Sequence, residues 1–435
     1  MIKITRRKMN RRTKEFTIIM AILALIAGTF VYTRQRTQIL HAEQYINKVK
    51  AQCYVFKESE YINLGRGEKV KFSVKEGQKV GANTTLSKTY KIKTNKYIND
   101  ALDVINWRLK HSSYDDRNTF VRDLLKVGEK VNKKQQEVES LKDSSDEEAK
   151  AKAEKQLRAL KKKQSIMQKS LKYIFADRDT LNTVKRELKS KKGIRKKTLT
   201  ISNLNFSYTG NIFFRTNGYE EVLDSNLMGI LNEEYFDFLD SFKAEPSDNE
   251  EDGQVIKIVH NEEIYICPIF EGDVFIKAEE ECKDYKKWIH DNFDVEELGG
   301  YYDLIERRVD ILRSFPSITI EDKEGNTKNG FLVDVLTFSD AKIPIICVKD
   351  EIASFMDVAN DTYNIYVEQV ECFVLPEEAL INKDNKTYVF VLTTGDFQEM
   401  VKVKVYKVEG GKVYLKLSEN EDLTENMEVI TNPGG

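Results

Sequence analysis

A seven-residue repeat of apolar side chains within residues 94–197 constrains this chain more than any other feature. The repeat is carried by Ala153, Leu157, Leu160, Met167, Leu171, Ile174, Leu181 and Leu188, with polar residues at the remaining seam positions Gln164, Arg178 and Lys185. Spacings of three and four place residues on one face of a helix. A sustained seven-residue period also makes two helices wind around each other. The segment therefore predicts a helix that packs lengthwise against another helix.

The preceding residues supply that other helix. Residues 94–141 contain no proline and have a looser apolar pattern, formed by Leu102, Ile105, Leu109, Phe120, Leu124, Val127, Val131, Val138 and Leu141. Ser145 and Glu148 have the spacing of a capping box, which predicts a helix start. We predict an antiparallel helical hairpin over 94–197. Because a lone hairpin buries too little to be stable, it should dock at its base or with other copies. A solvated charged helix pair is the alternative.

The N-terminus has the pattern of a membrane anchor. A basic tail, residues 1–15, precedes an uncharged run from Phe16 to Thr33. Such a run spans roughly 27 Å as a helix, enough for a thin bilayer. Basic flanks stay in the cytoplasm, so residue 34 onward should be extracytoplasmic. No Ala-x-Ala-like site follows the run, which argues against a cleaved signal peptide. Residues 37–50 could continue the helix out of the membrane.

Charge is divided unevenly between the two halves of the chain. Residues 1–197 hold 48 Lys+Arg and 22 Asp+Glu, whereas residues 198–435 hold 21 and 49. The basic half could meet anionic lipid, wall polymer or nucleic acid. The acidic half and the absence of a nucleic-acid motif lead us to expect no nucleic-acid partner. The basic cluster Lys161, Lys162 and Lys163 is read either as a solvated helix face or as a contact for an acidic partner.

No residue pattern in the sequence predicts catalysis. The five cysteines are scattered singly, so we expect buried small side chains rather than a disulfide framework or a metal site. The four histidines have no metal-ligand spacing, and no phosphate-binding or nucleophile-elbow motif occurs. We therefore predict no enzyme activity, no cofactor and no metal. A membrane-tethered enzyme acting on wall polymer would need a catalytic cleft that the sequence does not display.

Two β-rich segments flank the predicted hairpin. Residues 70–80 alternate apolar and polar side chains up to a turn at Gly77, and a similar pattern returns with Leu199, Ile201 and residues 208–214. The stretch Val74–Val80 resembles the "V-x-E-G-x-x-V" turn of biotinyl and lipoyl domains. Gly210 and Gly218 lie where the second lipoyl half-motif has glycines. No Met-Lys or Asp-Lys pair stands between 51 and 93, which argues against a carrier domain with a modified lysine.

A split lipoyl-like domain with an inserted hairpin, behind an anchor, resembles the HlyD-like membrane fusion (periplasmic adaptor) family. The resemblance implies an α+β, mainly β fold. Its parts would be a transmembrane helix at 16–33, a split lipoyl-like (barrel-sandwich hybrid) domain at 51–93 and 198–242, the α-helical coiled-coil hairpin at 94–197, a β-barrel domain at 243–375 and a C-terminal membrane-proximal β domain at 376–435. Residues 278–312 depart from the compact barrel of the family and predict one or two short helices. This insert could serve as a lid specific to one partner.

The C-terminal segment carries two further resemblances. Residues 374–381 resemble the family's "P-x-x-A-L" junction, and residues 423–435 resemble its closing "G-L-x-x-G-x-x-V-V" stretch. Asn426 stands where that stretch has glycine. Asparagine tolerates the left-handed backbone conformation better than most residues, so we expect the turn to be kept.

The family resemblance implies an export or efflux adaptor that works with an inner-membrane transporter, for example of the ABC type, and forms homo-oligomers. The hairpin tip is the expected contact region, so the predicted partner-binding residues are Ser144, Ser145, Asp146, Lys161, Lys162 and Lys163. Residues 139–150 lack the arginine of the family's channel-docking tip. That absence and the lysine-rich composition favour a Gram-positive-type member without an outer-membrane channel. A cell-envelope scaffold for wall synthesis or division, without transport, is the alternative function.

Overall fold

The computed structural model describes residues 20, 37–63, 72–81, 84–87, 92–93, 95–111, 117–141, 146–174, 176–191, 195–196, 199–200, 209–244, 246, 255–298, 300–393 and 397–433. The predicted cytoplasmic tail and, apart from Met20, the predicted anchor at 16–33 lie outside these residues. None of the helices within the described ranges has the length and apolar character needed to cross a membrane. The chain divides into two compact units, residues 1–47 with 368–435 and residues 48–367, and each is described by itself.

A closed β-barrel forms the centre of the unit 48–367. Its strands are β2 (Ala42–Phe56), β11 (Ile264–Glu271), β12 (Ser317–Glu321), β13 (Thr327–Thr337), β14 (Ala341–Val348) and β15 (Asn360–Pro376). They pair in the order β12-β13-β14-β11-β2-β15, and β15 pairs with β12 to close the ring. Closure leaves no strand of the ring with an open hydrogen-bonding edge. Strands β11 and β14 are buried along nearly their whole length, whereas β15 alternates buried and partly exposed residues over 363–368.

A second sheet joins strands from both sides of the helical segment. Its strands are β3 (Ser59–Asn63), β4 (Lys79–Val80), β9 (Gly210–Phe213) and β10 (Val255–His260), in the order β3-β10-β9-β4. Two short pairs lie between this sheet and the helices along the chain, β5 (Thr85–Ser87) with β8 (Leu199–Thr200) and β6 (Ile92–Lys93) with β7 (Arg195–Lys196). Residues before and after the helices are thus brought together, pair by pair, in one β module.

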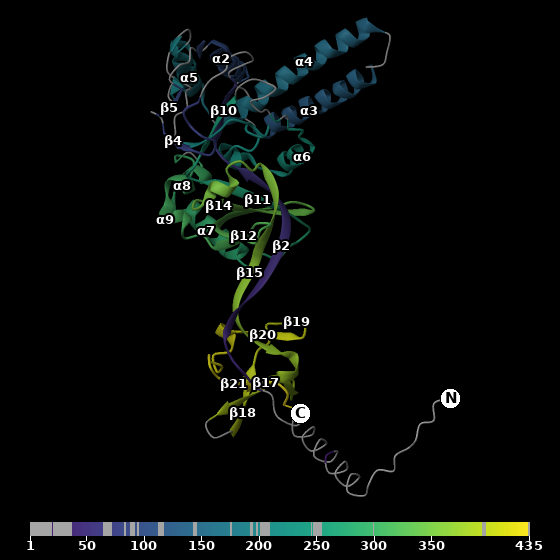
Figure 1. Cartoon of the computed structure of the whole chain (residues 1–435), viewed down its shortest axis with the longest axis vertical. Coiled ribbons are helices and arrows are strands. Elements are labelled where there is room, and N and C mark those ends of the chain that lie inside the picture. Colours follow the sequence, from purple (N-terminus) through teal and green to yellow (C-terminus); the bar gives the residue numbers. More distant parts are fainter. Residues whose placement is uncertain are drawn as a thin grey trace, which may run out of the picture. The chain divides into compact units, whose positions relative to one another are not determined.

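Helices occupy most of the described part of 94–197, in four pieces rather than two (Figure 1). They are α2 (Asn95–Lys110), α3 (Arg117–Ser140), α4 (Glu147–Ser170) and α5 (Arg178–Lys191). A 3-10 turn at Leu171–Tyr173 interrupts the return arm. As a result α4 packs on α3 while α5 packs on α2. The seven-residue seam continues across the break because the turn keeps Leu171 and Ile174 buried.

The start of α4 differs from the predicted capping box. The N-cap is Asp146, whose side chain accepts a hydrogen bond from the backbone N–H of Ala149 at 3.0 Å. An aspartate at this place also meets the positive end of the helix dipole. The helix therefore begins one residue later than a box built on Ser145 and Glu148 requires.

Shorter helices decorate the unit 48–367. The 3-10 helix Ser225–Ile230 and α6 (Glu233–Ser241) occupy a stretch that the sequence analysis assigned to the split β domain without predicting a helix there. The predicted insert at 278–312 is helical, but with three helices rather than one or two: α7 (Glu279–Asn292), α8 (Tyr301–Arg307) and α9 (Val309–Leu312). Helix α7 packs on β13 of the barrel. A further 3-10 turn, Ile352–Phe355, precedes β15.

The other unit is a β domain that includes the first described strand of the chain. Strand β1 (Thr37–Ile39) pairs with β21 (Glu428–Ile430), and β17 (Lys386–Thr393) pairs with β21, β16 (Ile381–Lys383) and β18 (Phe397–Val403). Strands β19 (Lys407–Glu409) and β20 (Lys412–Lys416) pair with each other, and β20 also pairs with the C-terminal part of β15. Leu40, Val391 and Val429 lie in its hydrophobic core.

Several predictions meet these strands directly. Residues 37–50, predicted as a possible continuation of the anchor helix, form β1 and the start of β2, so that prediction is wrong. Residues 51–56, predicted in the split β domain, pair with β11 of the barrel instead. Within 72–80 only β4 is strand, although the predicted turn is confirmed by Gly77 at φ 73°. The left-handed turn at Asn426 is also confirmed, with φ 68°.

Candidate functional site

The inner end of the α3–α4 pair, which we call the hairpin base, is anchored in the core of the barrel unit. One hydrophobic cluster runs from Phe120, Leu124 and Met167 through α6 to barrel residues such as Cys53 and Ile346. The helical segment therefore docks on the body of the unit at the inner end of the α3–α4 pair, beside the break at Leu171–Tyr173, whereas α2 and α5 share a small cluster of their own. Toward the tip the seam thins: beyond Val131 no residue of α3 is fully buried, and Leu157 and Leu160 of α4 are half-buried.

The described members of the predicted partner-binding set lie at two separate places, the N-cap of α4 and residues 161–163 of that helix. Ser144 and Ser145 lie outside the described residues. Asp146 is exposed at the tip and caps α4. The lysine cluster lies about 22 Å further along the helix, at roughly 1.5 Å per residue. There Lys162 faces Asp103 of α2 at 3.7 Å, Lys163 is exposed and Lys161 is half-buried.

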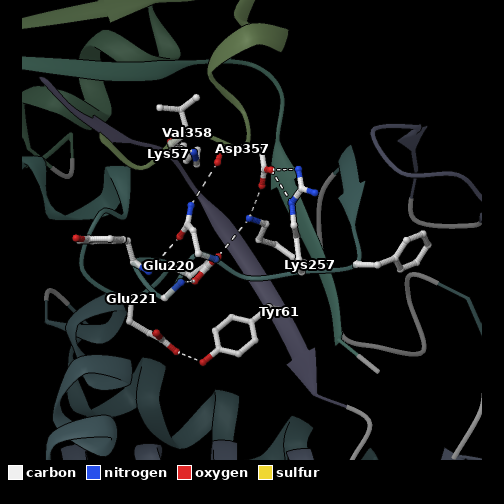
Figure 2. Close-up of polar contacts among 12 residues, drawn as sticks. Lys57, Tyr61, Glu220, Glu221, Lys257, Asp357 and Val358 are labelled. Carbon is white, nitrogen blue, oxygen red and sulfur yellow. Dashed lines mark hydrogen bonds and ion pairs between the residues drawn. The ribbon is translucent and has the colours of Figure 1, made fainter. Parts of the chain in front are cut away.

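A buried ion network that the sequence did not predict joins the β module to the barrel. Figure 2 shows Lys257 of β10 between two carboxylates. Its Nζ lies 3.2 Å from Glu220 Oε1 and 3.1 Å from Asp357 Oδ1, and the side chain is 0% exposed. Arg215 donates to Asp357 from Nε at 2.9 Å. Burial raises the pKa of Asp357, but the hydrogen bonds from Arg215 and Lys257 outweigh it and leave that pKa below its ordinary value.

Lys57, between the end of β2 and the start of β3, completes the network. Its ammonium donates to the carbonyl oxygens of Phe355, at 3.1 Å, and Val358. Burial, and then the charge of Lys257, lowers the pKa of Lys57 from 10.5 to about 7. Since 355–358 leads directly into β15, these contacts tie the sheet that carries the hairpin to the barrel wall. Buried ion pairs of this kind fix one geometry more than they add stability.

A lone charge inside an apolar strand was the signal for this network. Lys257 stands in Val-Ile-Lys-Ile-Val, a run whose other residues are all buried. A lysine at such a place must find partners, because an unpaired buried charge is very unfavourable. The sequence could not name the partners, which are 37 and 100 residues away.

A second polar cluster holds the hairpin base on β3. Tyr61 donates to Glu221 at 2.6 Å, as drawn in Figure 2. Lys169 lies 3.9 Å from Glu221, and Lys172 lies 3.7 Å from Glu60. Burial raises the pKa of Glu221 above its ordinary value. Two lysines from the end of α4 and the 3-10 turn after it thus contact two acids of the β module.

The break between α4 and α5 is held by one buried arginine. Arg108 of α2 donates to the carbonyl oxygens of Tyr173 and Ile174, each at 3.3 Å, and to that of His111 at 3.0 Å. A guanidinium can satisfy several carbonyls at once because its donors are fixed in a plane. Arg108 therefore caps the interrupted helix and binds it to α2.

We expect Arg108→Met to lower the free energy of unfolding by about 2–3 kcal/mol, because hydrogen bonds from a charged group are lost and the carbonyls stay buried. Urea unfolding followed by circular dichroism measures this. Arg178→Met, at an exposed position of α5, is the control and should change stability by less than about 0.5 kcal/mol. Equal effects from both variants would contradict the capping role of Arg108.

Glu58, whose Oε2 lies 3.3 Å from His260 Nδ1, makes the stability of the chain depend on pH. Burial, and then the charges of Asp224, Glu306 and Glu60, raises the pKa of Glu58 from 4.5 to about 8. The folded chain then keeps a proton that the unfolded chain releases, so stability should fall as pH rises from about 4.5 to 8. The pKa of Glu306, raised to about 7, and that of Asp224, raised to about 6, act in the same direction.

Glu58→Gln should therefore stabilise the chain at pH 8 and have little effect at pH 5. With 32% of the side chain exposed, solvent screening reduces the gain to about 1–2 kcal/mol. Urea unfolding of both proteins at the two pH values tests this. A gain of equal size at pH 5 would mean that packing, not ionisation, is responsible.

Comparison with known proteins finds distant likenesses among solved structures. No protein-family model matches the chain, and no curated protein matches it. MacA from Actinobacillus actinomycetemcomitans is 14% identical over 91% of this chain and 99% of its own, with a TM-score of 0.26. The membrane fusion protein Spr0693 from Streptococcus pneumoniae is 12% identical over 73% and 98%, with a TM-score of 0.23. A putative efflux transporter from Bacteroides eggerthii is 12% identical over 87% and 88%, with a TM-score of 0.26.

TM-scores this low do not establish a shared fold. The chain's own strand pairing, hairpin and buried contacts therefore have to support any functional interpretation. The five cysteines, predicted to be buried small side chains, are all buried, which confirms that prediction. No group of His, Cys, Asp or Glu within the described ranges could hold a metal ion.

Proposed function

We propose that the chain is a membrane-anchored, extracytoplasmic adaptor of an export or efflux system, of the membrane fusion type. The observation that carries the proposal is the strand order β3-β10-β9-β4, in which strands on either side of the helices pair in one sheet. Such pairing makes the helices an insertion, whose ends return to the same place. An insertion of this kind can project from a body that is complete without it.

The helical insertion has the form of a contact arm. Helix α4 alone has 24 residues, or roughly 36 Å at 1.5 Å per residue. Its base is fixed by the shared hydrophobic cluster and by Arg108, whereas its outer half buries little. No large apolar side chain is exposed on α3 or α4 among the described residues. We infer that the tip meets its partner through polar and charged side chains.

The pairing of β1 with β21 supports a membrane-proximal position for the C-terminal β domain. Thr37 pairs with Ile430, and only three residues separate Thr37 from the end of the predicted anchor. An extended chain of that length reaches about 14 Å at most. If Phe16–Thr33 spans the cell membrane with the N-terminus inside, this sheet lies beside the outer surface of that membrane.

We propose an inner-membrane transporter, for example of the ABC type, as the partner and a homo-oligomer as the working state. A Gram-positive-type source and the absence of an outer-membrane channel remain part of the proposal. We assign no chemical step to the chain. In the buried ion network of Figure 2 the charged groups are paired with one another, as they are in ion pairs that serve the structure alone.

Photo-cross-linking from the hairpin tip in native cells tests this function. The photoreactive residue replaces Glu148, which is exposed in the first turn of α4, and the control replaces Lys189, which is exposed on α5. We expect a transporter subunit to be captured from 148 and not from 189. Capture of division or wall-synthesis proteins without a transporter would favour a scaffold instead. Capture of neighbouring copies alone would count against a transporter contact at the tip.

A further inference from the structure

The helical insert of the barrel exposes an aromatic patch, formed by Tyr285, Trp288, Phe293, Arg308 and Val309. The rings of Tyr285 and Trp288 are stacked, with centroids 5.4 Å apart, and Phe293 meets Trp288 edge-on at 5.9 Å. The guanidinium of Arg308 lies 5.8 Å from the Phe293 ring. Trp288 remains 46% exposed and Val309 40%. A tryptophan exposed to this extent, within a cluster of other rings, is typical of a binding surface rather than of a core.

The aromatic patch stands on a rigid support. Cys282 and Ile289, on the face of α7 next to the one that carries Trp288, are buried against the barrel. Lys286 Nζ lies 2.5 Å from Asp334 Oδ2 of β13, and Tyr301 donates to the carbonyl of Val333 at 2.6 Å. Phe315 packs edge-on against Tyr285 at 4.7 Å. Trp288 is thus held in place before any partner arrives, which lowers the entropy lost on binding.

Carboxylates surround the aromatic patch. Asp284 and Asp291 lie four residues before and three residues after Trp288, on the same face of α7. Both are exposed, and neither has an ion-pair partner within the described residues. Asp294, Glu296 and Glu297 follow the end of the helix and are exposed as well. Of the two lysines between 284 and 297, Lys286 is engaged with Asp334, which leaves Lys287.

We propose that the aromatic patch binds a segment of a separate partner protein that carries a lysine or arginine beside an apolar side chain. The cation would lie over the indole of Trp288, between Asp284 and Asp291, where cation–π attraction and ion pairing act together. The apolar neighbour would cover Phe293 and Val309. Anionic lipid and nucleic acid are disfavoured because the surrounding charge has the same sign as theirs. The inference does not depend on the export role proposed above.

Photo-cross-linking at Lys287 in native cells tests the proposal with the full-length chain. The photoreactive residue there lies next to Trp288 and leaves the ring in place. The captured peptide is then sequenced by mass spectrometry. We expect one partner segment with lysine or arginine within a few residues of the cross-link. Asp284→Asn/Asp291→Asn should reduce capture at least about fivefold, whereas Glu280→Gln/Glu281→Gln, which removes two charges one turn further from Trp288 toward the start of α7, should reduce it less than about twofold.

The other outcomes overturn the proposal. They are capture of lipid alone, capture of a segment without a cation, capture of another copy of this chain, the absence of any capture, and equal loss in the two charge-neutralised variants. Loss of capture in Trp288→Ala is expected too, and an unchanged yield in that variant would remove the ring from the site. The variant should fold, since Trp288 is half exposed.

Fluorescence then measures the binding itself. The chain has two tryptophans, Trp107 and Trp288, so Trp107→Phe leaves Trp288 as the single reporter. A synthetic peptide with the captured sequence should change its emission in a saturable manner. Replacing the lysine or arginine of that peptide by glutamine should weaken binding about tenfold or more. Equal affinity of both peptides would exclude cation recognition.

Discussion

Lys257→Met is expected to lower the free energy of unfolding of the barrel unit by about 3–5 kcal/mol, one of the two largest effects that we predict for a single substitution in this chain. The methionine fills nearly the same volume, so packing changes little. What is lost is the cation between Glu220 and Asp357. The Glu220 side chain is 4% exposed and would keep only the backbone N–H groups of Asn217 and Gly218, at 2.9 and 3.0 Å.

Two further variants separate the lost charge from other causes. Glu220→Gln added to Lys257→Met should restore at least about 1 kcal/mol, because no buried charge then lacks its partner, while Arg215 still satisfies Asp357. Lys323→Met removes the same kind of pair at a site where lysine is 60% exposed, and should change stability by about 1 kcal/mol or less. Urea unfolding compares all three. A double variant as unstable as Lys257→Met alone would contradict the electrostatic explanation.

The local features of this fold were largely predictable from the sequence. The helices of 94–197 follow from the spacing of Leu171, Leu181 and Leu188, which are buried as expected. The turn at Gly77 and the left-handed conformation of Asn426 follow from the backbone preferences of those residues. Each of these features is decided by neighbours within one or two turns of chain, so a single sequence contains the necessary information.

Long-range pairing was the part that could not be predicted. Residues 37–56 form strands because β2 pairs with β11 and β15, and β1 pairs with β21. Each of these partners is more than 200 residues away. Taken alone, the stretch after an apolar run looks like more helix. The buried ion network around Lys257 was not predicted, for the same reason. The lone Lys257 in an apolar strand indicates that partners exist, but their identity depends on how three distant segments meet.

Gly210→Ala should lower the free energy of unfolding of the same unit by about 3 kcal/mol or more, since overpacking against backbone cannot be relieved by a side-chain rotation. Gly210 pairs with His260 of β10 on one side and with Val80 of β4 on the other. A Cβ at this position would lie 2.1 Å from the carbonyl oxygen of Val259 and 2.9 Å from Ile258 Cγ1. The glycine is therefore required by the close approach of β10.

The position of Gly210 also links stability to the proposed function, because β9 and β10 close the β module behind the hairpin. Gly81→Ala is the matched control: its Cβ would meet only Thr209 Cγ2, at an ordinary 3.5 Å, and stability should change by less than about 1 kcal/mol. Urea unfolding gives the stabilities, and limited proteolysis of 94–197 reports whether the hairpin loosens with the sheet. If Gly210→Ala were as stable as Gly81→Ala, β9 and β10 would not approach as closely as the structure has them, and the pairing that makes the hairpin an insertion would be in question.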